Sequence, residues 1–394
     1  MATGWLAGAL VLVGLAGPVA PAAAATIRSN PTPQVKTDLP GDLTGISCIS
    51  PDECTAVGWY AHDFTTQTSL AEVWNGATWT VQTTPNPADS TSTILVSDSC
   101  LPDGTCVAVG YYANESDQIL PLSEVWSGGD WSIVSPPSPT GATDAQLNSV
   151  SCVSDTDCTA VGVYNSTMGM AEVLDGESWT VQSTAVPKGS TGNTLNTVDC
   201  SGTTCMAVGS YATSSGMAKT LAESSTGTAW KVLTTPNAKG DTFNSFYGLS
   251  CTGVSSCLAT GYWFDSGAYT SAVAAAATWN GVTWKASKPR KPKGSNSKLQ
   301  SVSCGPSTCT AIGSYITPAN VAVSLAEEWT GTKWVIQKTP APKDPESYGL
   351  LGVSCGGATA CVAVGNNLVD EENAIPMAEG WNGAKWALQK MPTP

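Results

Sequence analysis

The sequence predicts an all-β fold, a seven-bladed β-propeller with four antiparallel strands per blade and one hairpin disulfide per blade. Three observations support this prediction. The composition is 42% hydrophobic and only 12% charged, and no long helical periodicity follows the N-terminal segment. A unit of about 50 residues recurs seven times along the chain. All 14 cysteines occur in pairs, and each unit holds one pair.

The first 25 residues differ in composition from the rest and predict a secretory signal peptide. They hold the apolar stretch "WLAGALVLVGLAG", and Ala23–Ala25 fits an A-x-A cleavage site. A membrane anchor is the alternative, which the glycines, prolines and alanines of this segment disfavour. No later stretch is long and apolar enough to span a bilayer. We therefore expect a secreted, extracellular protein without stable membrane insertion after cleavage.

Residues 26–42 are predicted to form either an N-terminal strand or a linker before the first blade. The segment "TIRSNPTP" (Thr26–Pro33) is similar to "TVQTTPNP" (Thr80–Pro87). It would then add an outer strand that fastens the last blade to the first, or it would connect without pairing. The last blade already has a tryptophan strand of its own at Trp386, so both alternatives stay open.

A glycine and a tryptophan mark every repeat. The glycine positions are Gly58, Gly110, Gly162, Gly209, Gly261, Gly313 and Gly365, spaced by 52 residues except for one spacing of 47. The tryptophan positions are Trp79, Trp131, Trp179, Trp230, Trp284, Trp334 and Trp386. Within a propeller of residues 43–394, the predicted blades cover about 43–85, 95–137, 147–185, 196–235, 246–288, 299–339 and 350–391.

One unit contains four short strand patterns. In the first unit they are Leu43–Cys48, Cys54–Tyr60, Leu70–Trp74 and Trp79–Gln82. The Asn-Gly pair in "NGAT" predicts a tight hairpin turn between the last two strands. The prolines of "TTPNP" end the unit, because proline cannot continue a hydrogen-bonded ladder. Four such strands per unit are typical of a propeller blade, and a linear stack of sheets is the alternative.

The paired cysteines are predicted to close the turn between the first and second strands of each blade. The pairs are Cys48/Cys54, Cys100/Cys106, Cys152/Cys158, Cys200/Cys205, Cys251/Cys257, Cys304/Cys309 and Cys355/Cys361. Each disulfide would contribute about 2 kcal/mol by restricting the unfolded chain. Zinc binding by the C-x5-C pairs is the alternative. It is disfavoured because the chain has one histidine and an export signal that implies an oxidising compartment.

The charge of the chain is −14 and is distributed unevenly. Residues 1–187 carry 2 basic and 19 acidic residues, and residues 188–394 carry 15 basic and 12 acidic residues. The acidic half would repel nucleic acid, so we expect no nucleic-acid partner. Within the basic cluster of residues 285–298, a candidate anion-binding patch consists of Lys288, Arg290, Lys291 and Lys293. A solvated basic loop is the alternative.

The loops between the second and third strands, together with the connections between blades, are predicted to form one variable face. Variable loops on a rigid scaffold are frequent binding sites. At the base of this face we expect a ring of ligand-binding aromatics at Tyr60, Tyr112, Tyr164, Tyr211, Trp263 and Tyr315. Such side chains stack well on sugar rings. Packing between blades is the alternative, because repetition favours a structural role.

Carboxylates occur both in the variable loops and at a repeated position of the blades. The loops offer Asp63, Glu115, Asp117, Asp265, Asp370, Glu371 and Glu372. These would bind Ca²⁺, the one cofactor we consider, or act at a glycosidic bond. The repeated residues are Glu72, Glu124, Glu172, Glu223, Glu327 and Glu379, with Ala277 in the fifth blade. For these we expect backbone or cross-strand hydrogen bonds.

The residue inventory disfavours several enzyme classes. A sialidase needs an arginine cluster, and the chain has only Arg28 and Arg290. A Ser-His-Asp site needs a histidine, and His62 lies in a polar loop without a G-x-S-x-G motif. Seven intact disulfides would leave no cysteine nucleophile, and no catalytic residue is assigned.

The repeat resembles three groups of propeller sequences. The apolar second strand ending in glycine and the tryptophan-bearing fourth strand are similar to kelch repeats, although this chain has one glycine where kelch repeats have two. The Gly-x-Thr-Trp sequences at Gly76–Trp79 and Gly281–Trp284 resemble a degraded Asp-box of sialidase-type propellers. The G-x-x-W rhythm is similar to that of seven-bladed bacterial lectins. These resemblances imply propeller architecture and leave the function open.

We therefore expect a monomeric binding module for extracellular glycans or for a surface protein, acting through the variable face. A polysaccharide hydrolase or lyase that uses Asp and Glu on the same face is the second hypothesis. A non-catalytic envelope scaffold is the third. Because the repeats are so alike, the sequence favours binding or scaffolding over catalysis, and blade five departs most from the others.

Overall fold

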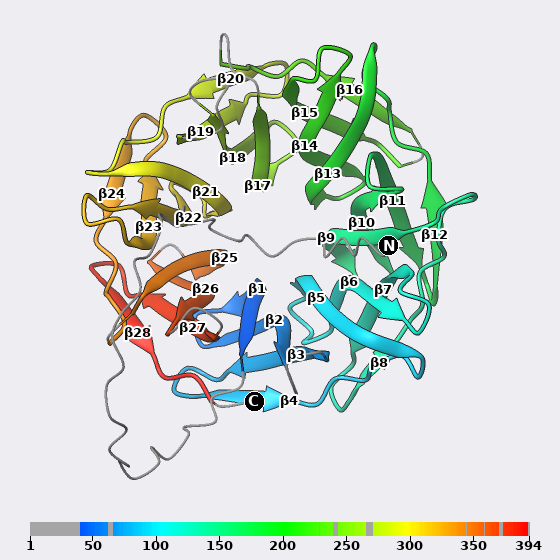
Figure 1. The fold of residues 1–394 in the computed structure, drawn as a ribbon, viewed down its shortest axis with the longest axis horizontal. Helices are drawn as coiled ribbons and strands as arrows, with labels where there is room; N and C mark the ends of the chain where they lie inside the picture. Colours follow the sequence, from blue (N-terminus) through cyan, green and yellow to red (C-terminus); the bar gives the residue numbers. More distant parts are fainter. Residues whose placement is uncertain are drawn as a thin grey trace, which may run out of the picture. The chain divides into compact units, whose positions relative to one another are not determined.

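The structure, a computed structural model, describes residues 40–61, 66–227, 229–238, 243–264, 271–343, 345–357, 359–369 and 373–392. The predicted signal peptide and the segment at residues 26–33 lie outside the described residues. The described part of the chain forms seven four-stranded antiparallel sheets arranged in a ring (Figure 1). The predicted seven-bladed β-propeller is therefore confirmed.

The blades are numbered in chain order. The strands of blades 1 to 3 are β1 (Gly41–Ser50), β2 (Glu53–Ala61), β3 (Gln67–Trp74), β4 (Trp79–Gln82), β5 (Ser90–Cys100), β6 (Cys106–Asn114), β7 (Ile119–Trp126), β8 (Trp131–Ile133), β9 (Ala145–Ser154), β10 (Asp157–Tyr164), β11 (Met168–Asp175) and β12 (Ser178–Gln182).

The strands of blades 4 and 5 are β13 (Ser190–Ser201), β14 (Thr204–Thr213), β15 (Ala218–Ser225), β16 (Trp230–Leu233), β17 (Asn244–Gly253), β18 (Ser256–Phe264), β19 (Ala272–Trp279) and β20 (Trp284–Ser287). The strands of blades 6 and 7 are β21 (Ser295–Cys304), β22 (Cys309–Ile316), β23 (Ala322–Trp329), β24 (Trp334–Gln337), β25 (Ser347–Gly357), β26 (Ala360–Leu368), β27 (Ala374–Trp381) and β28 (Trp386–Gln389).

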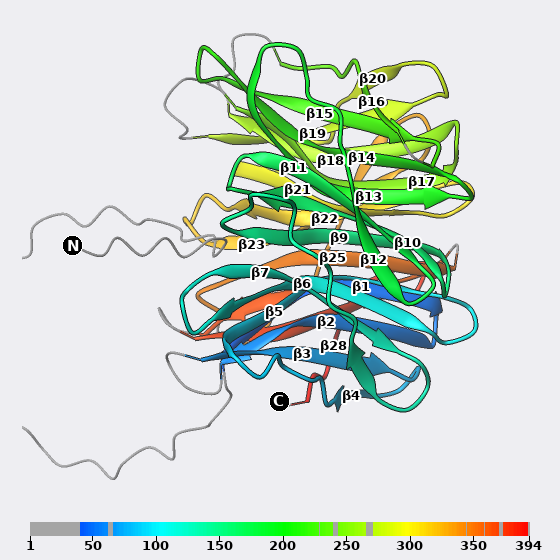
Figure 2. The same cartoon turned by 90° about the vertical axis from the view of Figure 1, so that its right-hand side faces the viewer.

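Every blade is built from one continuous stretch of chain. In each sheet the four strands are neighbours in sequence order, with the first innermost and the short fourth strand outermost (Figure 1). Seen from the side, the strands run from one face of the ring to the other (Figure 2). The hairpin turns within β1–β2 and β3–β4 therefore lie on one face, and the β2–β3 loops and blade connections lie on the other.

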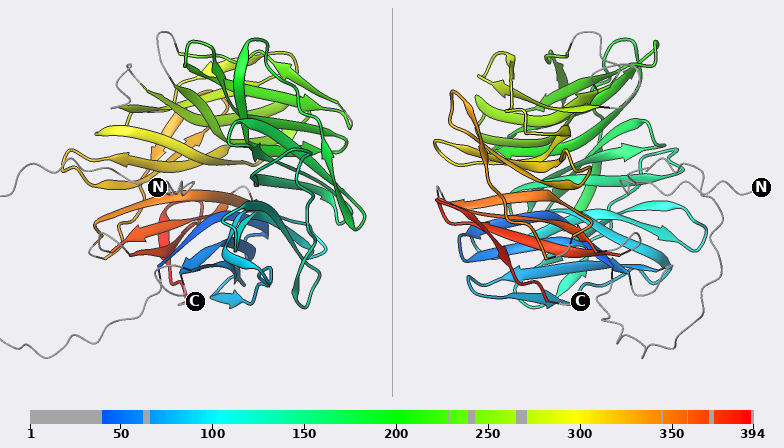
Figure 3. Two further views of the ribbon diagram at one scale, coloured as in Figure 1. Left: turned by 45° about the vertical axis from the view of Figure 1, so that its right-hand side comes forward. Right: turned by 60° about the vertical axis from the view of Figure 1, so that its left-hand side comes forward.

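The hydrophobic core consists of seven clusters, and each cluster fills the junction between two neighbouring blades. The oblique views show successive sheets packed face to face around the ring (Figure 3). The ring closes through the same kind of cluster, in which Leu43, Leu70 and Trp79 of blade 1 pack on Val364 and Ala378 of blade 7. Burial of such side chains contributes about 1.5–3 kcal/mol for each large residue.

The repeated glycine is required by a close approach of two strands. At Gly58, a Cβ atom would lie 1.8 Å from the carbonyl oxygen of Asp42 on the neighbouring strand. At Gly162 it would lie 2.0 Å from the carbonyl oxygen of Gln146. The partner strand has a register shift at this point, between Leu43 and Gly45 in blade 1. Any other side chain would therefore push the first strand of the blade away.

The predicted disulfides are confirmed in every blade. All seven join the first and second strands, and no cysteine is free. The bonds are Cys48–Cys54, Cys100–Cys106, Cys152–Cys158, Cys200–Cys205, Cys251–Cys257, Cys304–Cys309 and Cys355–Cys361. Such a set of disulfides suggests an extracellular or otherwise oxidising environment. A search of the described residues finds no helix with the length and apolar character to cross a membrane.

The second cysteine of each pair lies deeper than its predicted place at a turn implies. Cys205 is 8% exposed and Cys257 is 6% exposed, and both are members of hydrophobic clusters. Cys205 shares its cluster with Val161 of blade 3, and Cys257 shares its cluster with Met206 of blade 4. Four more second cysteines are buried in the same way: Cys54, Cys106, Cys158 and Cys361.

The buried second cysteine therefore has a role in packing as well as its predicted role in the disulfide. The physical reason is the direction of the side chain. At the start of its second strand, each blade turns this sulfur toward the preceding blade, so Cys205 and Cys257 also serve as small apolar core residues. The pairing stands as predicted, and the second cysteine additionally belongs to the packing between blades.

A belt of hydrogen bonds joins the blades beside the disulfides. The residue before the first cysteine of each blade accepts a hydrogen bond from the backbone N–H of the first cysteine in the next blade. The distances from nitrogen to oxygen are 2.7–3.0 Å at all seven junctions. Serine provides the acceptor in six blades and Asp199 in blade 4. This contact explains why serine precedes cysteine so regularly, a signal that the sequence analysis left unused.

Candidate functional site

The predicted aromatic ring lies at the ends of the second strands. Its six residues, Tyr60, Tyr112, Tyr164, Tyr211, Trp263 and Tyr315, are all half-buried. The five tyrosines pack against hydrophobic clusters at the junctions. Each tyrosine therefore contributes to packing between blades while part of its surface stays open to the variable face.

The acidic residues of the variable face are described only in part. Asp63, Asp265, Asp370, Glu371 and Glu372 lie outside the described residues, as does His62. Glu115 and Asp117 lie in the exposed turn that follows β6. Within the described ranges, no group of three or more His, Cys, Asp or Glu side chains is placed to hold a metal ion.

A groove lies elsewhere, at the outer edge of the ring between blades 5 and 6. Its volume is about 780 Å³, within the range of ligand sites. The end of β20 and its connection form one side. The end of β23, the turn that follows it and β24 form the other. This groove belongs to the outer strands and a β3–β4-type turn, which the sequence analysis treated as structural.

Aromatic and apolar side chains line much of the groove. Trp329 is half-buried, Trp334 is buried, and Val335 and Ile336 are 38% and 41% exposed. The two indole rings lie with their centroids 5.4 Å apart. An exposed aliphatic surface beside an indole is suited to the apolar face of a sugar ring.

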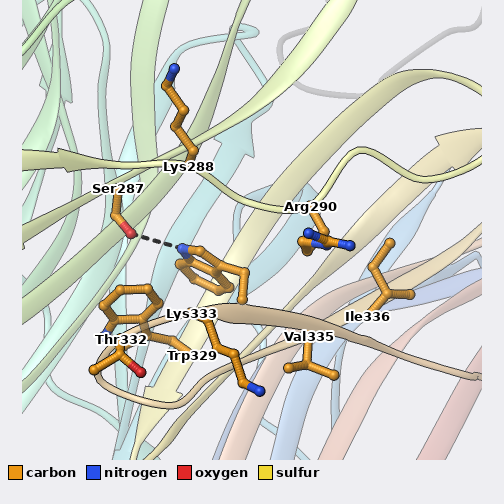
Figure 4. A pocket seen from close by; sticks show the side chains of 9 residues that line it. Ser287, Lys288, Arg290, Trp329, Thr332, Lys333, Val335 and Ile336 are labelled. Carbon is orange, nitrogen blue, oxygen red and sulfur yellow. Dashed lines mark hydrogen bonds between the residues drawn. The ribbon is translucent and has the colours of Figure 1, made fainter.

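The remaining lining side chains are basic or carry a hydroxyl group. Lys288, Arg290 and Lys333 supply three cations, and Ser287 and Thr332 supply hydroxyls (Figure 4). Among the described residues, no carboxylate or histidine lines the groove. Two members of the predicted anion patch, Lys288 and Arg290, thus meet at this groove.

Lys291 and Lys293, the other two members of the predicted patch, are exposed and do not line the groove. Lys333 joins Lys288 and Arg290 from the next blade, from the turn before β24. A sequence window around residues 285–298 does not contain Lys333, so only the packing of the two blades combines these cations.

This junction differs from four others in the acceptor for the indole N–H of its outer-strand tryptophan. At four junctions the indole Nε1 of the outer-strand tryptophan donates to a glutamine at the end of the preceding blade. The pairs are Trp79–Gln389, Trp131–Gln82, Trp230–Gln182 and Trp386–Gln337, at 2.8–3.3 Å. Blade 5 has Ser287 in place of this glutamine, and its hydroxyl accepts from Trp334 Nε1 at 2.8 Å (Figure 4). The shorter serine thus provides the acceptor that glutamine provides at the other four junctions.

The two remaining junctions have neither the glutamine nor its hydrogen bond to the tryptophan. There the glutamine is replaced by Val134 or Leu233, which cannot accept a hydrogen bond. The facing indole nitrogens, Nε1 of Trp179 and of Trp284, are buried and have no hydrogen-bond partner among the described residues. The residue at the end of each outer strand therefore decides what the next blade's tryptophan contacts.

A second, smaller groove lies at the ring-closing junction between blades 7 and 1. Its volume is about 280 Å³. Gln389 lines it, and so do Asp52, Trp74 and Trp381. The cavity at this junction is smaller, and the charged side chain that lines it, that of Asp52, is acidic.

The six repeated glutamates are completely buried between blades. Hydrogen bonds reach two of them: Ala185 N donates to Glu223 Oε2 at 2.9 Å, and Arg290 N donates to Glu327 Oε2 at 2.7 Å. Burial raises the pKa of these two carboxyls to about 7, and the N–H donors oppose the rise. The expected backbone hydrogen bond is thus confirmed at these two positions.

The other four glutamates face a proline at the equivalent place in the preceding blade, which has no N–H to donate. The expected hydrogen bond is wrong for all four, because the carboxyl oxygens of Glu72, Glu124, Glu172 and Glu379 have no hydrogen-bond partner among the described residues. For Glu124 and Glu379, only a nearby serine hydroxyl, of Ser69 or Ser324, opposes the effect of burial. Burial raises the pKa of all four to about 8.

Blade 5 also holds an aromatic group near the inner strands. The rings of Tyr247 and Tyr262 stack with centroids 5.0 Å apart, and Tyr262 Oη donates to Tyr247 Oη at 3.0 Å. Lys298 Nζ lies 4.9 Å from the centroid of the Tyr262 ring. Burial lowers the pKa of Lys298. Its ammonium group is therefore engaged in packing, apart from the groove cations.

No family model matches the chain, and no curated protein matches its sequence. Solved β-propeller structures are similar to it in fold. A lectin from Burkholderia pseudomallei has a TM-score of 0.57 at 9% identity, covering 89% of this chain and 100% of the lectin. An ulvan lyase of a polysaccharide lyase family has a TM-score of 0.56 at 11% identity, covering 90% of this chain and 98% of the lyase.

A third similar structure is the β-propeller domain of the Trilobed protease from Pyrococcus furiosus, described as having an open velcro topology. Its TM-score is 0.53 at 10% identity, and the match covers 89% of this chain and 100% of that domain. At such identities the likeness concerns the fold alone. By its own strands and by these comparisons, the chain is a disulfide-bonded, seven-bladed β-propeller.

Proposed function

We propose that this protein is a non-catalytic binding module for extracellular glycans. The observation that carries the proposal is the groove between blades 5 and 6, where Trp329 and aliphatic side chains lie beside three cations in a cavity of about 780 Å³. Ligand sites commonly combine an apolar surface with a few polar groups in this way. The lectin and the polysaccharide lyase of similar fold, together with the disulfides, support an extracellular glycan as the partner.

The lining of the groove favours binding over cleavage. Hydrolysis of a glycosidic bond ordinarily uses two carboxyl groups that flank the bond. No described carboxylate lines the groove, and its hydroxyl groups have no histidine beside them to act as a base. A ligand in this groove would therefore be held without being cut.

The variable face, with the ring of half-buried aromatics, is a second candidate surface for the same function. It would present Tyr60, Tyr112 and Trp263 to a glycan, and Ca²⁺ would assist if the acidic loops bind it. Hydrolase or lyase chemistry would also belong to this face, because Glu115 and Asp117 lie there. A surface protein is the alternative partner of either site.

The test is binding of the purified chain, from Thr26 onward, to an array of extracellular and cell-wall polysaccharides with and without Ca²⁺. We expect specific binding that is lost in Trp329→Ala and kept in the combined variant Tyr60→Ala, Tyr112→Ala and Trp263→Ala. The opposite pattern would move the site to the variable face. Binding to no glycan would refute the proposed function, and release of new reducing ends from a bound polysaccharide would refute its non-catalytic part.

A further inference from the structure

We propose that the groove between blades 5 and 6 selects an anionic polysaccharide, one that carries carboxylate or sulfate groups, and that Ser287 is the residue that opens this site. The inference rests on the proposed glycan-binding function. It adds the chemical class of the ligand and the reason why one junction in seven would bind it.

The first argument for an anionic ligand is the positive charge of the groove. Lys288, Arg290 and Lys333 are all exposed, and all three line a cavity that no described carboxylate lines. The chain as a whole has a charge of −14, so this local excess of positive charge opposes the overall field. Arginine binds carboxylate and sulfate through paired N–H donors, and lysine adds a mobile point charge. The groove is therefore matched to an anionic ligand.

A buried carboxyl group at this junction already accepts a hydrogen bond. Glu327 is completely buried beneath this junction, and its Oε2 accepts the backbone N–H of Arg290 at 2.7 Å. The contact fixes the connection after β20 at Arg290, while the guanidinium of that exposed residue remains available to a ligand. Because the backbone at Arg290 is already held in place, its side chain loses less conformational entropy when a ligand binds.

The aromatic and aliphatic lining favours a saccharide over other polyanions. Trp329, Val335 and Ile336 offer flat and apolar surface between the cations. A pyranose ring has an apolar face that stacks on such a surface while its charged substituent reaches a cation. Nucleic acid is also anionic, but its phosphates would meet the strongly acidic residues 1–187, which carry 19 acidic and 2 basic residues.

Comparison of the junctions gives Ser287 its role. At the ring-closing junction the equivalent residue is Gln389, whose Oε1 accepts a hydrogen bond from Trp79 Nε1 at 2.8 Å. Between blades 6 and 7 the sequence again offers a tryptophan and lysines, Trp381, Lys338 and Lys385. There, however, Gln337 reaches across to Trp386 Nε1 at 2.8 Å. Cations beside tryptophan thus recur, and at the junction of blades 5 and 6 Ser287 stands where Gln337 stands between blades 6 and 7.

The decisive variant is Ser287→Gln, because it introduces the residue that four other junctions already carry. It should keep the fold and the contact to Trp334 while its amide group occupies the groove. Binding of polygalacturonate and of dextran sulfate would be measured by titration against unmodified dextran. We expect the wild-type chain to bind the two anionic polymers at least about tenfold more tightly than dextran, the size of effect that charged hydrogen bonds provide.

Ser287→Gln should weaken this binding by about tenfold or more, with an unchanged melting curve. Lys288→Ala, Arg290→Ala and Lys333→Ala should each weaken it and reduce its dependence on salt concentration. The matched control is Lys291→Ala with Lys293→Ala, which removes two cations of the same segment that do not line the groove. This control should leave the affinity within about twofold, since screened charges outside the site contribute little.

Each other outcome overturns a defined part of the argument. Equal affinity for dextran and the anionic polymers would refute the anionic ligand and leave the glycan-binding function standing. Anionic binding that survives Ser287→Gln would refute this groove as the site. Binding of single-stranded DNA or polyglutamate as tight as that of polygalacturonate would replace the saccharide with a general polyanion. Absence of binding to every glycan would refute the proposed function itself.

Discussion

At the residue scale, the tryptophan that begins each outer strand connects two blades. All seven are buried, with 4–7% of their surface exposed. Their rings fill the junction clusters, and five of their indole nitrogens reach an acceptor on the preceding blade. One residue type thus supplies a large buried apolar group at all seven junctions and a directional contact at five of them.

Replacement of Trp79 by alanine should lower the free energy of unfolding by about 3–5 kcal/mol, because it empties a core site at the ring-closing junction. Trp79→Phe is the control that keeps most of the apolar volume and loses only the hydrogen bond to Gln389, at a cost of about 1 kcal/mol. Denaturant titration of both variants measures the difference. A negligible effect of Trp79→Ala would mean that this indole does not stabilise the ring.

At the scale of the strands, the third strand of six blades buries a carboxyl group at the junction. Burial raises the pKa of Glu72 and its equivalents to about 7 or 8, far above the usual range of a glutamate. The folded chain therefore binds more protons than the unfolded chain between about pH 4.5 and pH 8. In this range each further rise in pH lowers the stability of the folded protein, because charged carboxylates would lack water.

We expect the free energy of unfolding to be higher at pH 5 than at pH 9. Glu72→Gln replaces the buried acid with a neutral group of the same shape, so it should match the wild type at pH 5. At pH 9 it should be more stable by up to about 5 kcal/mol, since burial raises the pKa of Glu72 from 4.5 to about 8 and one pKa unit corresponds to about 1.4 kcal/mol. The measurement is denaturant unfolding at the two pH values.

Glu177→Gln is the control for this experiment, because Glu177 is exposed in the β11–β12 turn. It should change stability at neither pH. If Glu72→Gln and Glu177→Gln had the same effect at pH 9, the buried carboxyls would not be the source of the pH dependence.

At the scale of the whole molecule, the ring closes without exchange of strands among the described blades. Blade 1 and blade 7 are each complete, and blue β1 lies beside orange β25 (Figure 1). The closing junction uses the contacts of the other six: a hydrophobic cluster, the bond from Cys48 N to Ser354 Oγ, and the Trp79–Gln389 pair.

With no strand exchange among these blades, the disulfides become important for keeping each blade intact. Thiol titration of the unfolded, unreduced protein should find almost none of the 14 cysteines free. Reduction should lower the unfolding midpoint, since each disulfide contributes about 2 kcal/mol. Several titratable thiols before reduction, or an unchanged midpoint after it, would contradict this role.

The regular features of the fold could be predicted because they repeat. The cysteine pairs, the glycine and the tryptophan recur at nearly constant spacing, so each repetition tests the interpretation of the others. Relations between blades were harder to interpret. The burial of Cys205 and Cys257 depends on the preceding blade. Four of the six buried glutamates face a proline of the preceding blade. Because proline has no N–H to donate, the carboxyl groups of Glu72 and Glu172, for example, have no hydrogen-bond partner among the described residues. Neither relation can be read from a single repeat.

The sequence by itself determined the number of blades, the strands within each blade, the disulfide pairs and the presence of a basic segment near Lys288. These features depend on contacts within one repeat, where residues close in the chain are also close in space. Only the tertiary structure decided the groove, because Ser287 and Trp334 come from different blades and lie 47 residues apart. A binding site at a junction is set by the packing of two sheets, and this packing brings Lys333 to Arg290 as well.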